Sequence, residues 1–552
     1  MTSPASLIAP SKSRACPATL FRVLIFMVIA TLFSCTTRIA APITTSTEMF
    51  HEGEYVGSLW HMAAWQSNKA PFPLLIHGAM DYSPSQVALK VYGKSRIIGG
   101  TRVINTLIVL FTWLVFMELV YQMTAPTLRT AWRIGLAVGL FALLAPPWFS
   151  LPVQVTEAFV GIRDSFLLLI LLANVHFWKA ARRWSPVLAA TCAGLLPFAA
   201  AWSYDRGLIA AGLIGLMMGA MAWHRRWHDL IAAAVSLAIV SLLLGQLRFF
   251  GSFAGNGQNI LYWLSNSAVV WGLPFKFPEL DSVLGAMLTG LCLLMIGLSA
   301  QHLRNNSTPA SVVPIAGLLV VQILLAKTSL NRPSGVRVLA SLYPSVLILV
   351  HIATHRLPIR SNAARPPNIG SPWQLQSTLL YLCGALLGLI IALIALPRHP
   401  LTIAGLSFFK TLRKPAIDLR MVPPEVAKLG LKLRTVPEPF LFGWSNEGVL
   451  NLLARKRWAT RFSYAVYASP ASEPKLLAEL KSLNAQIIVT RPNDWAMNID
   501  GRSMAERLPA TAKYIDSQFP FSKKYGTYTL LACQPILESP MNPPALEGPA
   551  VE

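Results

Sequence analysis

Two glutamates one residue apart, Glu52 and Glu54 in "HEGEY", are the side chains of this sequence best placed to do chemistry. They follow a first apolar segment, in a chain where only 11 Asp or Glu precede residue 400. A carboxylate beside an apolar wall can have a raised pKa and act as a general base. Two carboxylates can also bind a divalent cation through their oxygens, or simply be solvated at a membrane edge. Since positions i and i+2 of a helix point to different faces, the spacing leaves these three roles open.

The composition predicts a membrane protein with many spans. The 552 residues are 54% hydrophobic and 13% charged, with a mean hydropathy of +0.50. A soluble protein carries about 25% charged residues. The net charge of the whole chain is +23. In the first 400 residues, most of the excess basic charge lies in short loops between apolar runs. That pattern is typical of topology signals and argues against nucleic-acid binding. Six scattered cysteines without a CxxC pair indicate neither a disulfide framework nor a zinc site.

Apolar runs near the length of a bilayer span predict about eleven transmembrane helices. With the N-terminus (1–19) inside, most loop arginines and lysines face the cytoplasm, as the positive-inside rule requires. Nine of the 11 acids then face outside or lie at the outer edge. The expected spans are 20–36, 103–122, 134–149, 164–178, 186–202, 207–223, 230–249, 282–300, 311–329, 337–354 and 377–396.

Three further segments are expected outside the bilayer. The first outer loop, 37–102, is too long for a simple connector and has aromatic residues that suit interfacial helices. A second long outer loop covers 255–281. An odd number of spans places the C-terminal part outside, where 401–535 has strand-like and helical patterns typical of a small soluble α/β domain. The proline-rich tail, 536–552, is expected to be disordered.

The order of these features resembles the GT-C class of polyprenyl-phosphate-dependent membrane glycosyltransferases, and uncharacterised bacterial members in particular. The resemblance is carried in the first loop by "HEGE", then "PFPLLIHG" and "MDYSP". In the tail it is carried by "PFLFGWSNEGVLNLLARKRWATRFSY" and "LLAELKSLNAQIIVT". It implies a multi-pass protein of the bacterial inner membrane with a periplasmic C-terminal domain. The implied reaction moves a sugar from a polyprenyl phosphate to a glycan, lipid or protein acceptor, with inversion.

The resemblance also implies roles for named residues. Glu52 or Glu54 would be the catalytic base, with a divalent cation between them in some members of the class. A departing lipid phosphate needs positive charge. The expected substrate-binding residues are Asp81, Asp205, Arg206, Lys327, Arg332 and Arg337. Asp205 and Arg206 in "SYDRG" could equally be an ion pair at the membrane edge. His77 is interpreted as structural.

Two alternatives to an enzyme stay open. A transporter or lipid-linked-glycan flippase would need ionisable residues deep within spans and two matching halves. Glu118 is the only clear acid within an expected span, and the sequence has no such symmetry. In a non-catalytic scaffold the loop acids would be incidental. The position of Glu52 and Glu54 relative to the basic loops distinguishes these possibilities.

Overall fold

The computed structural model describes residues 15–36, 47, 49–145, 159–247, 253–272, 276, 278–305, 308–332, 334–356, 372–395, 413–491 and 496–535. The expected disordered tail, the linker that precedes residue 413 and the expected outer-face acid Glu157 lie outside these residues.

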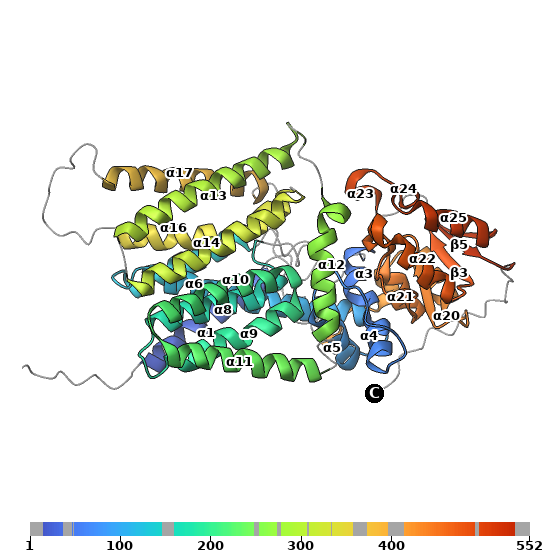
Figure 1. Cartoon of the computed structure of the whole chain (residues 1–552), viewed down its shortest axis with the longest axis horizontal. Helices are drawn as coiled ribbons and strands as arrows, with labels where there is room; N and C mark the ends of the chain where they lie inside the picture. Colours follow the sequence, from blue (N-terminus) through green and yellow to red (C-terminus); the bar gives the residue numbers. More distant parts are fainter. Residues whose placement is uncertain are drawn as a thin grey trace, which may run out of the picture.

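A bundle of long apolar helices forms one half of the molecule (Figure 1). Within the described residues, six helices are long and apolar enough to cross a membrane, and these are α6, α9, α10, α11, α13 and α14. The expected number of eleven spans stays a prediction. The bundle helices are α1 (Ala15–Thr36), α6 (Ile97–Met123), α7 (Thr130–Leu144), α8 (Ser165–Lys179), α9 (Ser185–Trp202), α10 (Tyr204–Trp223), α11 (Trp227–Gln246), α13 (Leu280–Asn305), α14 (Pro309–Leu330), α16 (Tyr343–Arg356) and α17 (Pro372–Ala395).

The outer surface of the bundle is apolar where lipid would contact it. On α11, Ile231, Val235, Ile239 and Leu242 are all exposed. Their spacing of three or four residues places them on one face of the helix. A contiguous apolar face of this kind is unfavourable in water and is solvated by lipid tails in a bilayer.

Aromatic and basic residues mark one end of the bundle. The exposed tryptophans there are Trp132, Trp184, Trp223 and Trp227. They lie at the ends of α7, α9, α10 and α11, next to the basic pairs of the connecting loops. Tryptophan at the membrane–water interface, beside clustered Arg and Lys, is typical of a cytoplasmic membrane boundary.

Several expected spans differ from the observed helices at their ends, and two of the differences have a clear physical reason. Helix α6 begins at Ile97 rather than 103, because Asp418 of the C-terminal part accepts hydrogen bonds from the N–H groups of Ile97 (3.0 Å) and Ile98 (2.9 Å). The span expected at 337–354 is divided into α15 (Gly335–Ala340) and α16. The break has a local reason, since Pro344 follows it and proline is favoured only in the first turn of a helix.

The C-terminal residues form a small α/β domain, as expected (Figure 1). Its sheet has the strand order β2-β1-β3-β5-β4, with β1 parallel to β2 and β3, and β5 antiparallel to β3 and β4. The strands are β1 (Phe440–Gly443), β2 (Arg457–Trp458), β3 (Ile487–Thr490), β4 (Phe521–Tyr525) and β5 (Tyr528–Ala532). The helices are α19 (Asp418–Met421), α20 (Pro424–Arg434), α21 (Gly448–Ala454), η6 (Ala465–Tyr467), η7 (Pro470–Ser472), α22 (Glu473–Ser482), α23 (Met497–Asp500), α24 (Met504–Arg507) and α25 (Pro509–Gln518).

A layer of short helices lies between the bundle and this domain. The first outer loop forms α3 (His51–Gly57), α4 (Leu59–Gln66), η1 (Ala79–Tyr82) and α5 (Ser83–Tyr92). Helix α12 (Phe253–Trp271) crosses the ends of the bundle helices in Figure 1. The expected second outer loop is therefore largely a helix.

The asparagines and glycines of α12 suggest a loop, but tertiary contacts stabilise it as a helix. One face bonds to the first loop, with Asn259 Nδ2 donating to Pro73 O at 3.0 Å and Trp263 Nε1 to Leu75 O at 2.6 Å. The other face exposes apolar residues such as Leu261 and Leu264. An amphipathic helix with these two faces suits a membrane surface.

Candidate functional site

Glu52 is tied to the bundle by a buried ion pair. Its two oxygens accept from Arg102 on α6, with Nε at 2.5 Å and Nη2 at 2.6 Å. Both side chains are less than a tenth exposed. A bidentate pair of this kind fixes geometry as well as charge. Glu52 therefore joins α3 to α6, and both of its oxygens are already bonded.

Glu54 points to a different part of the site. Its Oε2 lies 3.9 Å from Nε2 of His77, with both side chains buried. Nε2 of His77 lies 2.5 Å from Nη2 of Arg163 and accepts its hydrogen bond. Burial, and next the charge of Arg163, hold the pKa of His77 well below its usual value. The lowered pKa favours the neutral form of the His77 imidazole.

A close backbone approach explains the "HG" of the first loop. Gly78 donates from its N–H to Trp202 O at 3.2 Å, at the end of α9. A Cβ at this position would overlap the backbone carbonyl of Ala201. Only glycine permits this approach, and the approach brings the neighbouring His77 to the C-terminal end of α9. There His77 borders Glu54, and its expected structural role stays a prediction.

Asp81 lies in η1 and is almost fully buried, at 1% exposed. Among the described residues neither of its carboxyl oxygens has a hydrogen-bond partner. The pKa of Asp81 is raised to about 8, mainly by burial; the charge of Arg163 opposes the shift and that of Asp205 adds to it. At pH 7 the group is therefore mostly a neutral acid, able to donate a hydrogen bond.

Arg206 belongs to a buried ion-pair network at the start of α10. Its Nε donates to Asp164 Oδ1 at 2.7 Å and its Nη1 to Asp205 Oδ2 at 2.8 Å. Ser203 Oγ donates to Asp205 at 2.5 Å. Two carboxylates surround one guanidinium, so the ion-pair interpretation of "SYDRG" describes Arg206 better than a free phosphate ligand does.

The remaining basic candidates lie beside α12 and α13. Arg332 is 5.8 Å above the ring of Trp271, the last residue of α12. Lys327 is exposed at the end of α14, and Arg337 lies in α15. Gly335 N donates to Asp281 on α13 at 2.9 Å. The structure thus brings Glu54, Asp81, Asp205 and Arg206 together and places these three cations at a neighbouring edge.

Two residues of this site, Arg163 and Asp164 in "IRDS", carried no specific signal in the sequence. Arg102 was expected, with Lys94 and Arg96, as an outer-face cation for the lipid phosphate, and it is instead the partner of Glu52. A short signal exists in retrospect, because "IRD" stands just before the apolar helix α8 and "YDR" opens the apolar helix α10. Neither pattern says which acid meets which base, since their partners come from distant segments.

A divalent cation between the two glutamates does not fit this arrangement. Both oxygens of Glu52 are bonded to Arg102, and Glu54 lies toward His77. No group of three or more His, Cys, Asp or Glu among the described residues is arranged to hold a metal ion.

Comparison with known proteins finds similarity in fold. No protein-family model matches the chain, and no curated protein sequence matches it significantly. The chain is similar along nearly its whole length to the crystal structure of ArnT from Cupriavidus metallidurans bound to undecaprenyl phosphate. The identity is 12% and the TM-score 0.44, covering 96% of this chain and 100% of that one. For the crystal structure of the same protein in the apo state, the identity is 13% and the TM-score 0.44, covering 95% of this chain and 99% of that one.

Proposed function

We propose that the protein is a GT-C-type membrane glycosyltransferase. It would move a sugar from a polyprenyl phosphate to a glycan, lipid or protein acceptor on the periplasmic side of the bacterial inner membrane. The observation that carries this proposal is the buried carboxylate of Glu54. Its Oε2 lies 3.9 Å from Nε2 of His77, which accepts from Arg163, and the charge of Arg163 also acts on Asp81, where the first loop meets the ends of α8, α9 and α10. This end of the bundle is opposite the tryptophan- and arginine-rich end and adjoins the C-terminal domain.

Glu54 rather than Glu52 is the proposed base. Its carboxylate would take the proton of the acceptor hydroxyl as the acceptor oxygen bonds to the anomeric carbon. The bond from that carbon to the lipid phosphate oxygen breaks, and the configuration inverts. A base must reach the proton that it removes. Glu52 does not suit this role because Arg102 occupies both of its oxygens.

Other residues would bind and orient the substrates. Neutral Asp81 would donate a hydrogen bond to a sugar or acceptor hydroxyl. Arg163 places a positive charge near Asp81 and Asp205, where it would stabilise charge that develops on the phosphate. Lys327, Arg332 and Arg337 stay candidates for the lipid phosphate at the α12 edge.

The transporter alternative loses its main support. Glu118 forms a bidentate pair with Arg22 of α1, at 2.7 and 2.8 Å. The pair lies near the C-terminal end of α6, where Lys179 donates a hydrogen bond to Gln122 O. An acid paired there is not a mid-membrane site for a transported ion.

The direct test is sugar transfer in membranes that contain the protein. Membranes are loaded with radiolabelled polyprenyl-phosphate sugars, with and without chelator, and the label is followed from lipid to acceptor. We expect transfer that persists with chelator. A label that changes leaflet but stays on the lipid would instead identify a flippase.

A further inference from the structure

The backbone of helix α3 packs directly against the backbone of α21 in the C-terminal domain. Gly53 and Gly57 lie four residues apart, on one face of α3. Both face Gly448, the first residue of α21. A Cβ on Gly57 would lie 2.5 Å from Gly448 O, and a Cβ on Gly53 would lie 2.8 Å from Gly448 N. Three glycines therefore form a seam that no larger side chain could enter without moving the helices apart.

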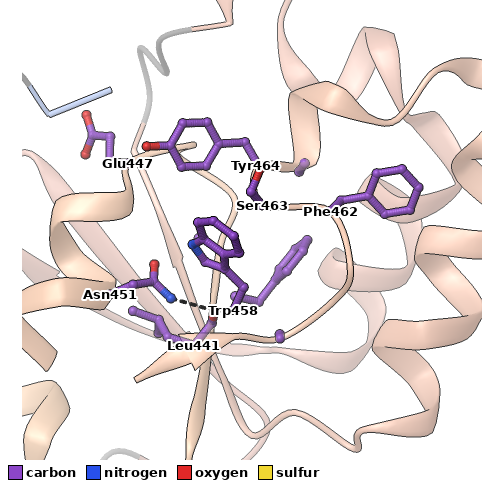
Figure 2. A pocket seen from close by; sticks show the side chains of 11 residues that line it. Leu441, Glu447, Asn451, Trp458, Phe462, Ser463 and Tyr464 are labelled. Atoms are coloured by element: carbon purple, nitrogen blue, oxygen red, sulfur yellow. Dashed lines mark hydrogen bonds between the residues drawn. The ribbon is translucent and has the colours of Figure 1, made fainter. Parts of the chain in front are cut away.

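A single hydroxyl completes this seam. Tyr464 OH donates to Phe50 O at 2.8 Å and accepts from Gly448 N–H at 2.9 Å. The Tyr464 ring also packs on Phe50, with centroids 4.8 Å apart. In Figure 2 the hydroxyl of Tyr464 points toward the segment of Glu447, which leads into Gly448.

The small cavity around Tyr464 does not hold a substrate. It is lined by Glu447, Asn451, Trp458, Ser463 and Tyr464, among others, and its volume is about 10 Å³ (Figure 2). That is room for one water molecule. The Tyr464 hydroxyl is therefore placed to hold helix α3 through Phe50 O rather than to contact a sugar.

The same carbonyl connects Tyr464 to the proposed base. Phe50 O accepts from the N–H of Glu54 at 2.9 Å as well as from Tyr464 OH. A hydrogen bond from a tertiary partner to this carbonyl fixes the first turn of α3. We propose that Tyr464 is a positioning residue that acts through Phe50 O to hold Glu54 in place. Its effect on catalysis rests on the proposed function, whereas its effect on α3 does not.

Tyr467 supplies a matched control. It is buried, and its ring lies 5.4 Å from that of Tyr464 and 6.4 Å from that of Phe50. Its hydroxyl has no hydrogen-bond partner among the described residues. Tyr467→Phe therefore removes a phenolic oxygen from the same aromatic cluster without removing a described hydrogen bond.

The test compares Tyr464→Phe with Tyr467→Phe in the full chain. Hydrogen exchange of residues 50–57 should be roughly fivefold faster in Tyr464→Phe, because a net hydrogen bond contributes about 1 kcal/mol. The kcat for sugar transfer should fall by about 10- to 100-fold, with an unchanged KM for the donor. Tyr467→Phe should change neither exchange nor kcat. A merely structural role would lower the amount of folded protein and leave kcat per folded molecule unchanged.

The outcomes separate the proposal from the function. Unchanged exchange in Tyr464→Phe, or an equal change in Tyr467→Phe, would overturn the proposal. Faster exchange in a protein that transfers no sugar would support the positioning role and overturn the proposed function. If Tyr464→Phe does not fold, Trp60→Phe tests the same seam, since Trp60 Nε1 donates to Leu452 O of α21 at 3.1 Å. The proposal then requires faster exchange in 50–66, and unchanged exchange would reject it.

Discussion

At the scale of the residue, the two glutamates of "HEGE" have different partners and should respond differently to the same change. Glu54→Gln keeps the size of the side chain and removes the proposed base. We expect sugar transfer to fall by about 10²- to 10⁴-fold with expression unchanged. Initial rates in membranes with matched protein content measure this. Full activity in Glu54→Gln would remove Glu54 from the mechanism.

Glu52→Gln should act on stability instead. It leaves the Arg102 guanidinium buried without its carboxylate, which costs about 3–5 kcal/mol in buried pairs of this kind. The measurement is the thermal midpoint of the purified protein in detergent. Glu52→Gln combined with Arg102→Met is the control and should be less destabilised than the two single changes added together. Strict additivity would show that the pair is not coupled.

Asp81 should make stability depend on pH. Its pKa is raised from 3.8 to about 8 in the folded protein, so folding favours the protonated form. The stabilisation is fully present below pH 3.8 and is lost as the pH rises through about 8. Asp81→Asn cannot ionise and should therefore lose less thermal stability than the wild type between pH 5 and about 8. Parallel curves for the two proteins would contradict this origin of the pH dependence.

At the scale of the element, α6 depends on a cap from a distant segment. Asp418 accepts from the N–H groups of Ile97 and Ile98 and thus caps the helix that carries Arg102. Asp418→Ala should destabilise the protein by about 1 kcal/mol and speed hydrogen exchange at 97–100. Asp418→Asn keeps an acceptor oxygen and should lie nearer the wild type. Equal losses for the two variants would mean that the charge, rather than the cap, stabilises this end.

At the scale of the whole molecule, the two ends of the bundle should lie on opposite sides of the membrane. Trp223 is 84% exposed at the basic end, and Ser517 is exposed on α25 of the C-terminal domain. In a chain whose native cysteines are replaced, Ser517→Cys should react with an impermeant maleimide in spheroplasts. Trp223→Cys should react only after the membrane is opened. Labelling in the reverse order would invert the predicted topology.

The sequence predicted the elements of this protein better than their ends. Strands β3 and β5 fall within the strand-like sequences "AQIIVT" (485–490) and "GTYTLLAC" (526–533), and helix α22 matches the helical pattern of "PKLLAELKSL" (474–483) to within one residue at each end. Strand β2, with two residues, is too short to show a pattern. Helix α12 was missed because its asparagines and glycines favour a loop. The contacts that bury one face of this helix come from segments distant in sequence, such as Pro73, Leu75 and Tyr467.

The sequence by itself determined the fold class, a mainly helical membrane-type protein with a small C-terminal α/β part, and it predicted the stretch that is proposed to carry the chemistry. Crossing a bilayer requires long apolar segments, which are recognisable in a sequence, and the few acidic residues between such segments can then be identified. Only the tertiary structure distinguishes Glu52 from Glu54, because Arg102 comes from another helix and binds Glu52. The raised pKa of Asp81 also depends on the tertiary structure, since burial cannot be inferred from residue type. The pairing of charges and the loss of water around them depend on which distant segments meet.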